Sequence, residues 1–173
     1  MAGMRSTLLL TLLVCTACRS GTEPSSGELV ATWRDSLDAS FRTSATARWC
    51  RRDSLLELFA VRNDTAVGVA IMPRDTLAGG EYPVFPAVPF NSLRPQATAA
   101  ARWLDQAELK GFEGASGKVT VTASPPGTVS GTLDLLLRRT GNPDTLRVTG
   151  RFSAVPVESA LAVCGRANRP GAG

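Results

Sequence analysis

Cysteine offers the widest chemistry in this sequence, because the chain has four cysteines and no histidine. Cys15 and Cys18 stand close together near the N-terminus, whereas Cys50 and Cys164 are far apart in the rest of the chain. A nucleophilic cysteine or serine relies on a histidine base in the Cys-His and Ser-His-Asp mechanisms, which are therefore excluded. Without histidine the thiols also supply too few ligands for a zinc site. We therefore expect no catalytic residue, no metal and no cofactor.

Carboxylates and lysines are the remaining groups that could act as acids, bases or nucleophiles. A glycoside hydrolase needs two carboxylates that converge on one bond. The acidic residues are isolated in the sequence, as in Asp53, Glu57, Asp105, Glu108 and Glu113. Ser116 and Lys118 stand two apart on a predicted strand, where exposure is the ordinary outcome. The sequence thus predicts that the protein is not an enzyme, and a secreted hydrolase that uses carboxylates is a less favoured alternative.

The N-terminal segment is typical of a targeting signal. Arg5 precedes an apolar run over residues 8–14, which is too short for a membrane-spanning helix of about 20 residues. Small residues then lead into Cys18, and this arrangement resembles the lipobox of bacterial lipoproteins. The resemblance implies cleavage after Ala17, a diacylglycerol thioether on Cys18 and an N-terminus acylated with fatty acids such as palmitate. Cleavage before Cys15 is disfavoured because it would put a bulky valine at the cut, and an ordinary secretory signal stays open as the alternative.

Four regions follow from this interpretation of the N-terminus. They are a lipoprotein signal peptide at 1–17, a flexible tether at 18–28, a β domain at 29–165 and a disordered C-terminal tail at 166–173. The tether is small, polar and contains Pro and Gly, so it should act as a leash between lipid and domain.

The expected location is the bacterial cell envelope, with the membrane as partner through the lipid anchor. Arg19 follows Cys18 where some inner-membrane lipoproteins carry Asp. By resemblance, this residue favours the outer membrane, with the domain facing the periplasm or the cell surface.

The charge distribution excludes one class of partner. The chain carries a net charge of +4, which falls to +3 if Arg5 is removed with the signal. The basic residues are scattered, and only 51–52 and 138–139 are adjacent pairs. A nucleic-acid-binding protein concentrates basic residues in a stripe or patch. We therefore expect no nucleic-acid partner, and an envelope protein or a glycan stays open.

Cys50 and Cys164 remain once Cys15 is lost with the signal and Cys18 carries lipid. An exported protein with two remaining cysteines is expected to pair them. The disulfide would close the loop from residue 50 to residue 164, and the chain-entropy model gives such a loop about 4–5 kcal/mol of stabilisation as an upper figure.

A period of two dominates the hydrophobic pattern after residue 39. Apolar and polar residues alternate over 41–49 and 118–123, while 54–62 and 66–72 are apolar on nearly both faces. Turn residues separate these runs, as in Asn63-Asp64. The pattern predicts an all-β chain with a single antiparallel β-sandwich or barrel-like domain of about seven to eight strands. Gly131 and Gly150 interrupt good strands, which indicates a bulge, a bend or close backbone approach.

Residues 95–111 depart from this pattern. A proline near the start, helix-favouring residues inside and a glycine at the end give this segment the propensity and the ends of a helix.

A family resemblance favours a strand there instead. The relevant pieces are AGGEYP at 78–83, SGKVTVT at 116–122, VSGTLDL at 129–135 and VTGRFSA at 148–154. In order and spacing they resemble a set of uncharacterised bacterial lipoproteins, which often have an aromatic residue where this chain has Leu133. The resemblance covers roughly residues 40 to 155. It implies a small antiparallel β domain on a lipid tether, with no assigned activity and with an edge strand at 97–104.

The aromatic residues are the remaining candidates for a binding site. Trp103 and Tyr82 could form a platform for a carbohydrate or lipid, whereas Trp49 follows the inward pattern and is expected in the core. Trp33 lies in an opening strand or a short helix and could pack over the mouth of a barrel. The sequence therefore predicts a non-enzymatic binding or structural module, with a carbohydrate- or lipid-binding module as the alternative.

Overall fold

The computed structural model of the chain describes residues 27–34, 38–86, 94–122 and 125–161. Nine strands cover most of these residues, and no helix occurs among them. The strands are β1 (Glu28–Arg34), β2 (Asp38–Cys50), β3 (Leu55–Arg62), β4 (Thr65–Met72), β5 (Gly80–Pro83), β6 (Gln96–Asp105), β7 (Glu108–Thr122), β8 (Thr128–Arg139) and β9 (Thr145–Ala160). The predicted signal peptide, most of the tether and the C-terminal tail lie outside the described residues.

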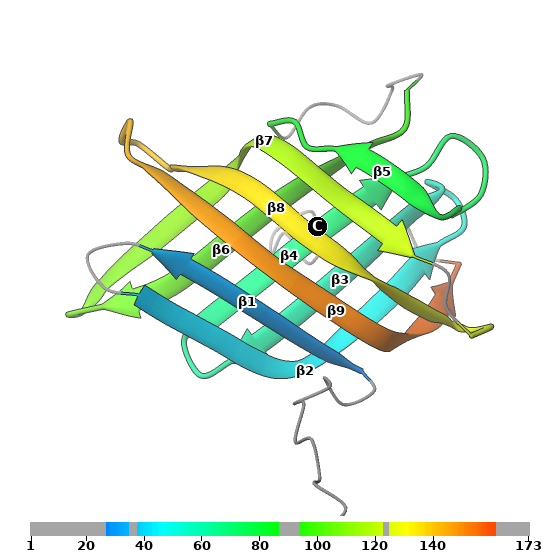
Figure 1. Cartoon of the computed structure of the whole chain (residues 1–173), viewed down its shortest axis with the longest axis horizontal. Helices are drawn as coiled ribbons and strands as arrows, with labels where there is room; N and C mark the ends of the chain where they lie inside the picture. Colours follow the sequence, from blue (N-terminus) through cyan, green and yellow to red (C-terminus); the bar gives the residue numbers. More distant parts are fainter. Residues whose placement is uncertain (1–26, 35–37, 87–93, 123–124, 162–173) are drawn as a thin grey trace, which may run out of the picture.

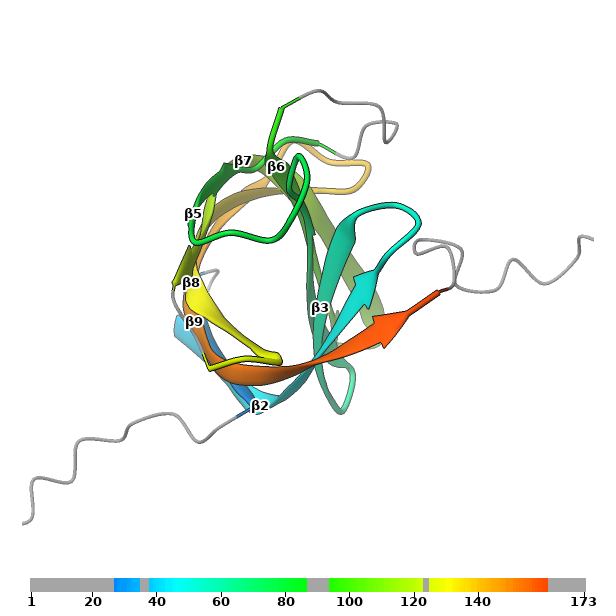
Figure 2. The same ribbon diagram turned by 90° about the vertical axis from the view of Figure 1, so that its right-hand side faces the viewer.

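All nine strands belong to one sheet that closes on itself. The order is β5-β7-β6-β4-β3-β2-β1-β9-β8, and β7 also pairs with β8 to complete the ring. The view along the barrel in Figure 2 shows this closed wall. Eight strands form the barrel and β5 is an extra strand on the second half of β7. The prediction of an all-β, barrel-like fold is confirmed.

The core fills the inside of the barrel with the inward half of each alternating pattern. Neighbouring strands contribute these residues at every second position, as in Leu133, Leu135 and Leu137 of β8. Small residues such as Ala45, Ala99 and Ala101 leave room for larger ones. The interior of an eight-stranded barrel is just wide enough for its own side chains. The interior of the barrel is therefore a packed hydrophobic core.

The two ends of the barrel differ in how the chain connects there. One end of the barrel, which we name the hairpin end, holds the β3–β4, β6–β7 and β8–β9 connections together with the last residues of β1 and the first residues of β2 (Figure 1). Gly27, which leads into β1, lies at the opposite end, which we name the leash end. The predicted tether thus joins the barrel at the end opposite these hairpins.

Two bulges and two close approaches shape the wall. The register shifts between Gly114 and Ser116 in β7, and between Val129 and Gly131 in β8. A Cβ added at Gly131 would meet the carbonyl oxygen of Thr120 and the ring of Phe152, and one at Gly150 would lie 2.7 Å from the carbonyl oxygen of Val30. Both glycines therefore mark close backbone approach, as predicted.

Residues 96–111 belong to the β-hairpin of β6 and β7. The predicted strand is therefore confirmed, although the helix propensity of residues 95–111 favoured a helix. The predicted edge position is wrong, because β6 pairs with β4 on one side and with β7 on the other. The turn consists of Gln106 and Ala107, whose φ angles are 47° and 69°. Two positive φ values are what a two-residue type I′ turn requires, although Asn and Gly are its usual residues.

Candidate binding site at the hairpin end

A row of four aromatic side chains crosses the barrel at the hairpin end. Trp33 of β1 stacks on Trp103 of β6, with ring centroids 5.3 Å apart and planes inclined by 22°. Phe112 of β7 stacks on Trp103 at 4.7 Å and 11°. Phe41 of β2 contacts Trp33 at 6.1 Å in a tilted arrangement. Because β1 and β6 lie on opposite sides of the ring, this aromatic row closes the bore of the barrel.

Stacking within the row limits how much of each aromatic ring is accessible to a ligand. Trp33, Phe41 and Phe112 are each at most 8% exposed. Trp103 is partly buried, and Trp33 and Phe112 cover its two faces. A sugar ring stacks on a free aromatic face, so Trp103 offers a ligand its indole edge instead.

Two recesses flank the aromatic row in the mouth of the barrel. The first recess has a volume of about 440 Å³ and lies beside the β3–β4 turn. Its lining consists of Trp33, Ala39, Ser40, Phe41, Arg62, Asn63, Asp64, Thr65, Trp103 and Leu104. It combines an apolar floor with a guanidinium, an amide, a carboxylate and hydroxyl groups, so it can contact both apolar and hydrogen-bonding parts of a small ligand.

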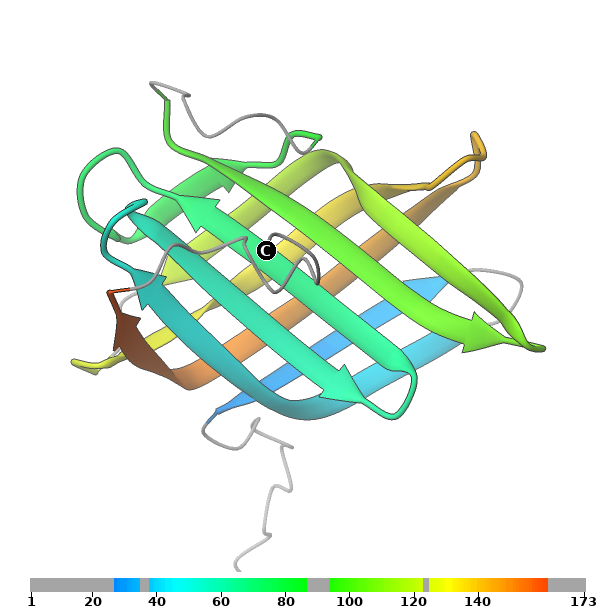
Figure 3. The ribbon, with the colours of Figure 1, turned by 180° about the vertical axis from the view of Figure 1, so that it is seen from behind.

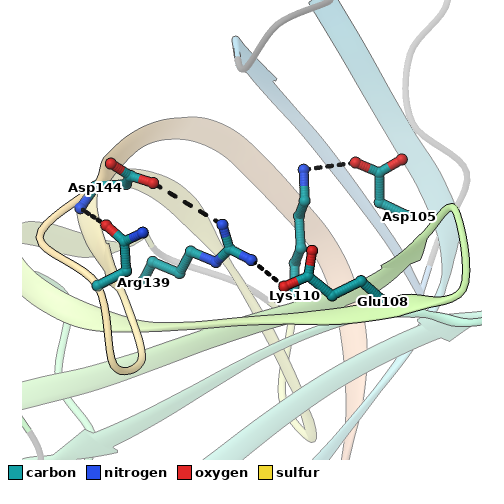
Figure 4. Close-up of polar contacts among 6 residues, drawn as sticks. Asp105, Glu108, Lys110, Arg139 and Asp144 are labelled. Carbon is teal, nitrogen blue, oxygen red and sulfur yellow. Dashed lines mark hydrogen bonds and ion pairs between the residues drawn. The ribbon is translucent and has the colours of Figure 1, made fainter.

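The second recess, of about 290 Å³, lies on the other side of the row. Its lining is Lys110, Phe112, Arg139, Asp144, Thr145 and Leu146. Figure 4 shows how ion pairs frame it. Lys110 pairs with Asp105 at 2.5 Å, and Arg139 pairs with Glu108 at 2.5 Å and with Asp144 at 3.9 Å.

In these ion pairs the basic side chains are more buried than the carboxylates. The side chains of Lys110 and Arg139 are 17% and 22% exposed, whereas their carboxylate partners are 43% to 64% exposed. The two cations thus point into the mouth and the carboxylates lie at its rim. The pairs also join the β6–β7 hairpin to the β8–β9 hairpin.

A larger hollow of about 700 Å³ lies on the outer wall over β1, β2 and β9. Its threonines and arginines already have interaction partners. The hydroxyls of Thr32 and Thr149 are 3.1 Å apart, and Arg147 donates to both carboxylate oxygens of Asp134. The first recess in the mouth differs from this hollow because three rings of the aromatic row line it, whereas one ring lines the hollow, and the mouth is therefore the better candidate site.

The structure separates the two aromatic residues that the sequence suggested as one platform. Trp103 pairs with Lys110 of β7, whereas Tyr82 pairs with Val119 of the same strand. Nine residues of strand correspond to roughly 30 Å. Tyr82 is also 95% buried, and its hydroxyl donates to the carbonyl oxygen of Ala78. Trp103 and Tyr82 therefore do not form one platform.

The carboxylates that the hydrolase alternative needs are engaged. Asp105 and Glu108 face each other across the β6–β7 hairpin, but each binds its own cation. Glu113 accepts a hydrogen bond from Arg138 at 3.0 Å. Asp53 and Glu57 also have interaction partners.

The environment of Lys118 favours its protonated form, which cannot act as a base. The side-chain hydrogen bond from Lys118 to Glu81, and then the negative charge of Glu81, raise its pKa above the ordinary value. A lysine that acts as a base needs a lowered pKa.

Two of the cysteine predictions lie outside the described residues, namely Cys18 as the lipid site and Cys164 as a disulfide partner. Cys50 is described: it is fully buried, it is disulfide-bonded, and it packs with Leu55 on the outer face of the barrel. Pairing of Cys50 with Cys164 stays a prediction. Trp49 is partly buried against the core.

Sequence reasoning missed several residues of the mouth. Phe41 and Phe112 were visible only as members of alternating patterns, and nothing in the sequence indicated that they extend a stack from Trp33 and Trp103. Lys110 and Arg139 stand in different strands, and their common recess depends on the ring closure between β7 and β8.

Comparison of the chain with protein-family models, curated proteins and solved structures finds no match. In the described part of the chain, no group of three or more cysteine, aspartate and glutamate side chains is placed to hold a metal ion. Among the same residues, no helix is long and apolar enough to cross a membrane.

Proposed function

We propose that this chain is a lipoprotein of the bacterial cell envelope, anchored by lipid on Cys18, whose barrel is a non-enzymatic binding module. The proposed binding site is the mouth at the hairpin end. The observation that supports this site most is the first recess, where Trp33, Phe41 and Trp103 form an apolar floor beside the polar β3–β4 turn.

The arrangement of the ends supports the same proposal. The tether joins the barrel at Gly27, at the leash end, so the anchor leaves the mouth unobstructed. The aromatic row fixes the floor of the recess, because its four rings come from four different strands. A site that needs no rearrangement loses less free energy on binding.

A glycan of the envelope is the ligand class that the first recess suits best among those considered. Asn63, Asp64 and Arg62 supply hydrogen-bond donors and acceptors at the rim, and the indole edges supply apolar contact. A carboxylate-based hydrolase is disfavoured, because each of Asp105, Glu108 and Glu113 is bound to a basic side chain.

The anchor is tested by the intact mass of the protein purified from native membranes, with and without reductant. We expect acyl mass on a chain that begins at Cys18, and a gain of about 2 Da on reduction, since one disulfide takes up two hydrogens. An unmodified chain would contradict the lipoprotein assignment. Acylation without the reduction shift would contradict only the disulfide.

The binding site is tested by titrating short envelope glycans against the mature protein while its tryptophan fluorescence is followed. We expect Asp64→Asn to weaken binding by about tenfold or more, since a hydrogen bond to a charged group contributes about 1.5–3 kcal/mol. Asp134→Asn is the matched control, because Asp134 lies on the outer wall and pairs with Arg147. Equal effects of the two variants would rule out the first recess.

A further inference from the structure

We propose that one outer wall of the barrel docks on the surface of the membrane that holds the lipid anchor. We name this surface the apolar wall; it rests on the lipid anchor of the proposed function and adds a second contact with the same membrane. It lies on β3, β4, β6 and the start of β7, whose outer side faces the viewer in Figure 3. Its members are Phe59, Val61, Ala66, Gly68, Ala100, Arg102, Leu104 and Leu109.

The apolar wall is continuous across the strands. Phe59 pairs with Gly68, which pairs with Ala100 in the next strand. Val61 pairs with Ala66, which pairs with Arg102, and the third row is Leu104 with Leu109. Each row points outward, because the residues between them belong to the core.

The large side chains of this wall are unusually open to solvent. The exposed fractions are 47% for Phe59, 58% for Val61, 49% for Leu104 and 61% for Leu109. Contiguous exposed apolar surface of this kind marks an interaction site in a soluble domain. Leu104 and Leu109 also flank the Gln106-Ala107 turn, so the tip of the β6–β7 hairpin is apolar on its outer side.

The opposite wall has a different character. On β8 and β9 the outward residues include Asp134, Arg138, Arg147 and Thr149. Leu136 is exposed there too, but the ion pairs of these neighbours surround it. The apolar character is therefore a property of one side of the barrel.

Charge favours a lipid surface as the occupant. Arg102 is the charged member of the apolar wall, and the described part of the chain offers it no carboxylate partner. A guanidinium amid apolar side chains can bind a lipid phosphate while its stem and its neighbours enter the interfacial layer. A second copy of the chain that packs about a two-fold axis through this wall would instead bring two such arginines together.

The leash is long enough for this orientation. Eight strands spaced about 4.8 Å apart and tilted by about 40° give a backbone cylinder of about 16 Å diameter. With the apolar wall on the membrane, β1 lies on the far side, since it is opposite β6 in the ring. Eight residues lie between Cys18 and Gly27, which makes nine Cα-to-Cα steps, and such a segment reaches up to about 30 Å. The reach of the leash thus exceeds the diameter of the barrel.

The docked orientation places the mouth sideways along the membrane surface. The first recess shares Leu104 with the apolar wall, so its ligand would sit next to the lipid head groups. The inference therefore narrows the proposed ligand to a group presented close to the membrane surface.

The experiment uses the mature lipidated protein in vesicles of phosphatidylethanolamine with a minor share of phosphatidylglycerol. Leu109→Trp and Val61→Trp place a reporter in the apolar wall, and Leu136→Trp is the matched control on the opposite wall. Flotation of the vesicles reports anchoring, and quenching by lipids brominated in their acyl chains reports contact. The unaltered protein gives the background from its own three tryptophans.

We expect all variants to float, with most of the added emission quenched at positions 109 and 61 and little of it at position 136. Two outcomes would overturn the docking but leave the anchor intact. In both, the protein floats with the vesicles, and the added tryptophans are either quenched equally on the two walls or not quenched at positions 109 and 61. Protein that does not float would overturn both. If cross-linking on the vesicles instead joins two copies through position 109, the occupant is a second chain and the lipid proposal is wrong.

Discussion

Replacing Trp103 by leucine tests whether the aromatic row stabilises the barrel or merely lines its mouth. Trp103 is the central member, with Trp33 on one face and Phe112 on the other. Leucine keeps an apolar side chain at the position but removes the indole ring, and with it the stacked contacts to both Trp33 and Phe112. The variant therefore isolates the contribution of the row from the general need for an apolar residue there.

The expected loss follows from the two ring pairs. A stacked pair contributes about 0.5–1.5 kcal/mol beyond its buried area, so the two pairs together give about 1–3 kcal/mol. The smaller volume of leucine adds about 1–2 kcal/mol at a partly buried position. We expect Trp103→Leu to lower the free energy of unfolding by about 2–5 kcal/mol.

Trp49→Leu is the matched control. Trp49 is also partly buried against the core, and the described residues give it no stacked ring. Only the volume contribution of about 1–2 kcal/mol should appear. Urea unfolding of the mature protein, followed by far-ultraviolet circular dichroism, gives both free energies by linear extrapolation. If the two variants lose the same free energy, stacking across the bore contributes nothing and the reasoning is refuted.

Three further substitutions test the wall and its turns by thermal or urea unfolding. Gly131→Ala should cost about 1–3 kcal/mol, since its Cβ would overlap the backbone carbonyl oxygen of Thr120, which cannot move aside easily. Gly68→Ala should cost less, since the tightest contact there is with the movable ring of Phe59; equal losses would contradict the close approach. Ala107→Gly should stabilise by about 0.5–1 kcal/mol because φ is positive there, and a loss of stability would count against the type I′ turn. Arg147→Gln should change stability by under about 1 kcal/mol, because its ion pair is largely exposed; a larger loss would assign that pair a structural role.

The strands could be predicted because their pattern is local. Alternation at every second residue follows directly from one face packing inward, and the alternating run over 118–123 does place Val119 and Val121 in the core. Barrel and sandwich remained alternatives in the sequence, because both bury the same alternating positions. The choice depends on the pairing of β7 with β8, which closes eight of the strands into a ring.

The β6–β7 hairpin shows where local reasoning fails. Residues 95–111 have helix-favouring side chains, and the turn at Gln106-Ala107 lacks the Asn and Gly that announce a type I′ turn. Pairing with β4 along the whole of β6 outweighs this propensity. The edge assignment was wrong for a related reason, since β6 lies between β4 and β7 in the sheet order and pairs with both.

The candidate site was harder to predict than the fold, because its parts meet only through the ring. Trp33 and Trp103 stand seventy positions apart in the chain, and their stack exists because β1 and β6 face each other across the bore. The sequence offered Tyr82 as the partner of Trp103, but β5 carries Tyr82 toward the other end of β7. Residue type alone cannot distinguish two aromatics at one end of a barrel from two at opposite ends.

The same ring geometry links the proposed site to the proposed membrane contact. Leu104 of β6 belongs to the lining of the first recess and is also a member of the apolar wall, so it borders both. A substitution at Leu104 would therefore confound the two, whereas Asp64 reports on the recess and Leu109 on the wall. Loss of glycan binding in Asp64→Asn with quenching unchanged at Leu109→Trp would show that the barrel docks and binds through separable surfaces. If Asp64→Asn abolished both glycan binding and lipid quenching, the recess and the apolar wall would depend on each other, and the two surfaces would not be separable.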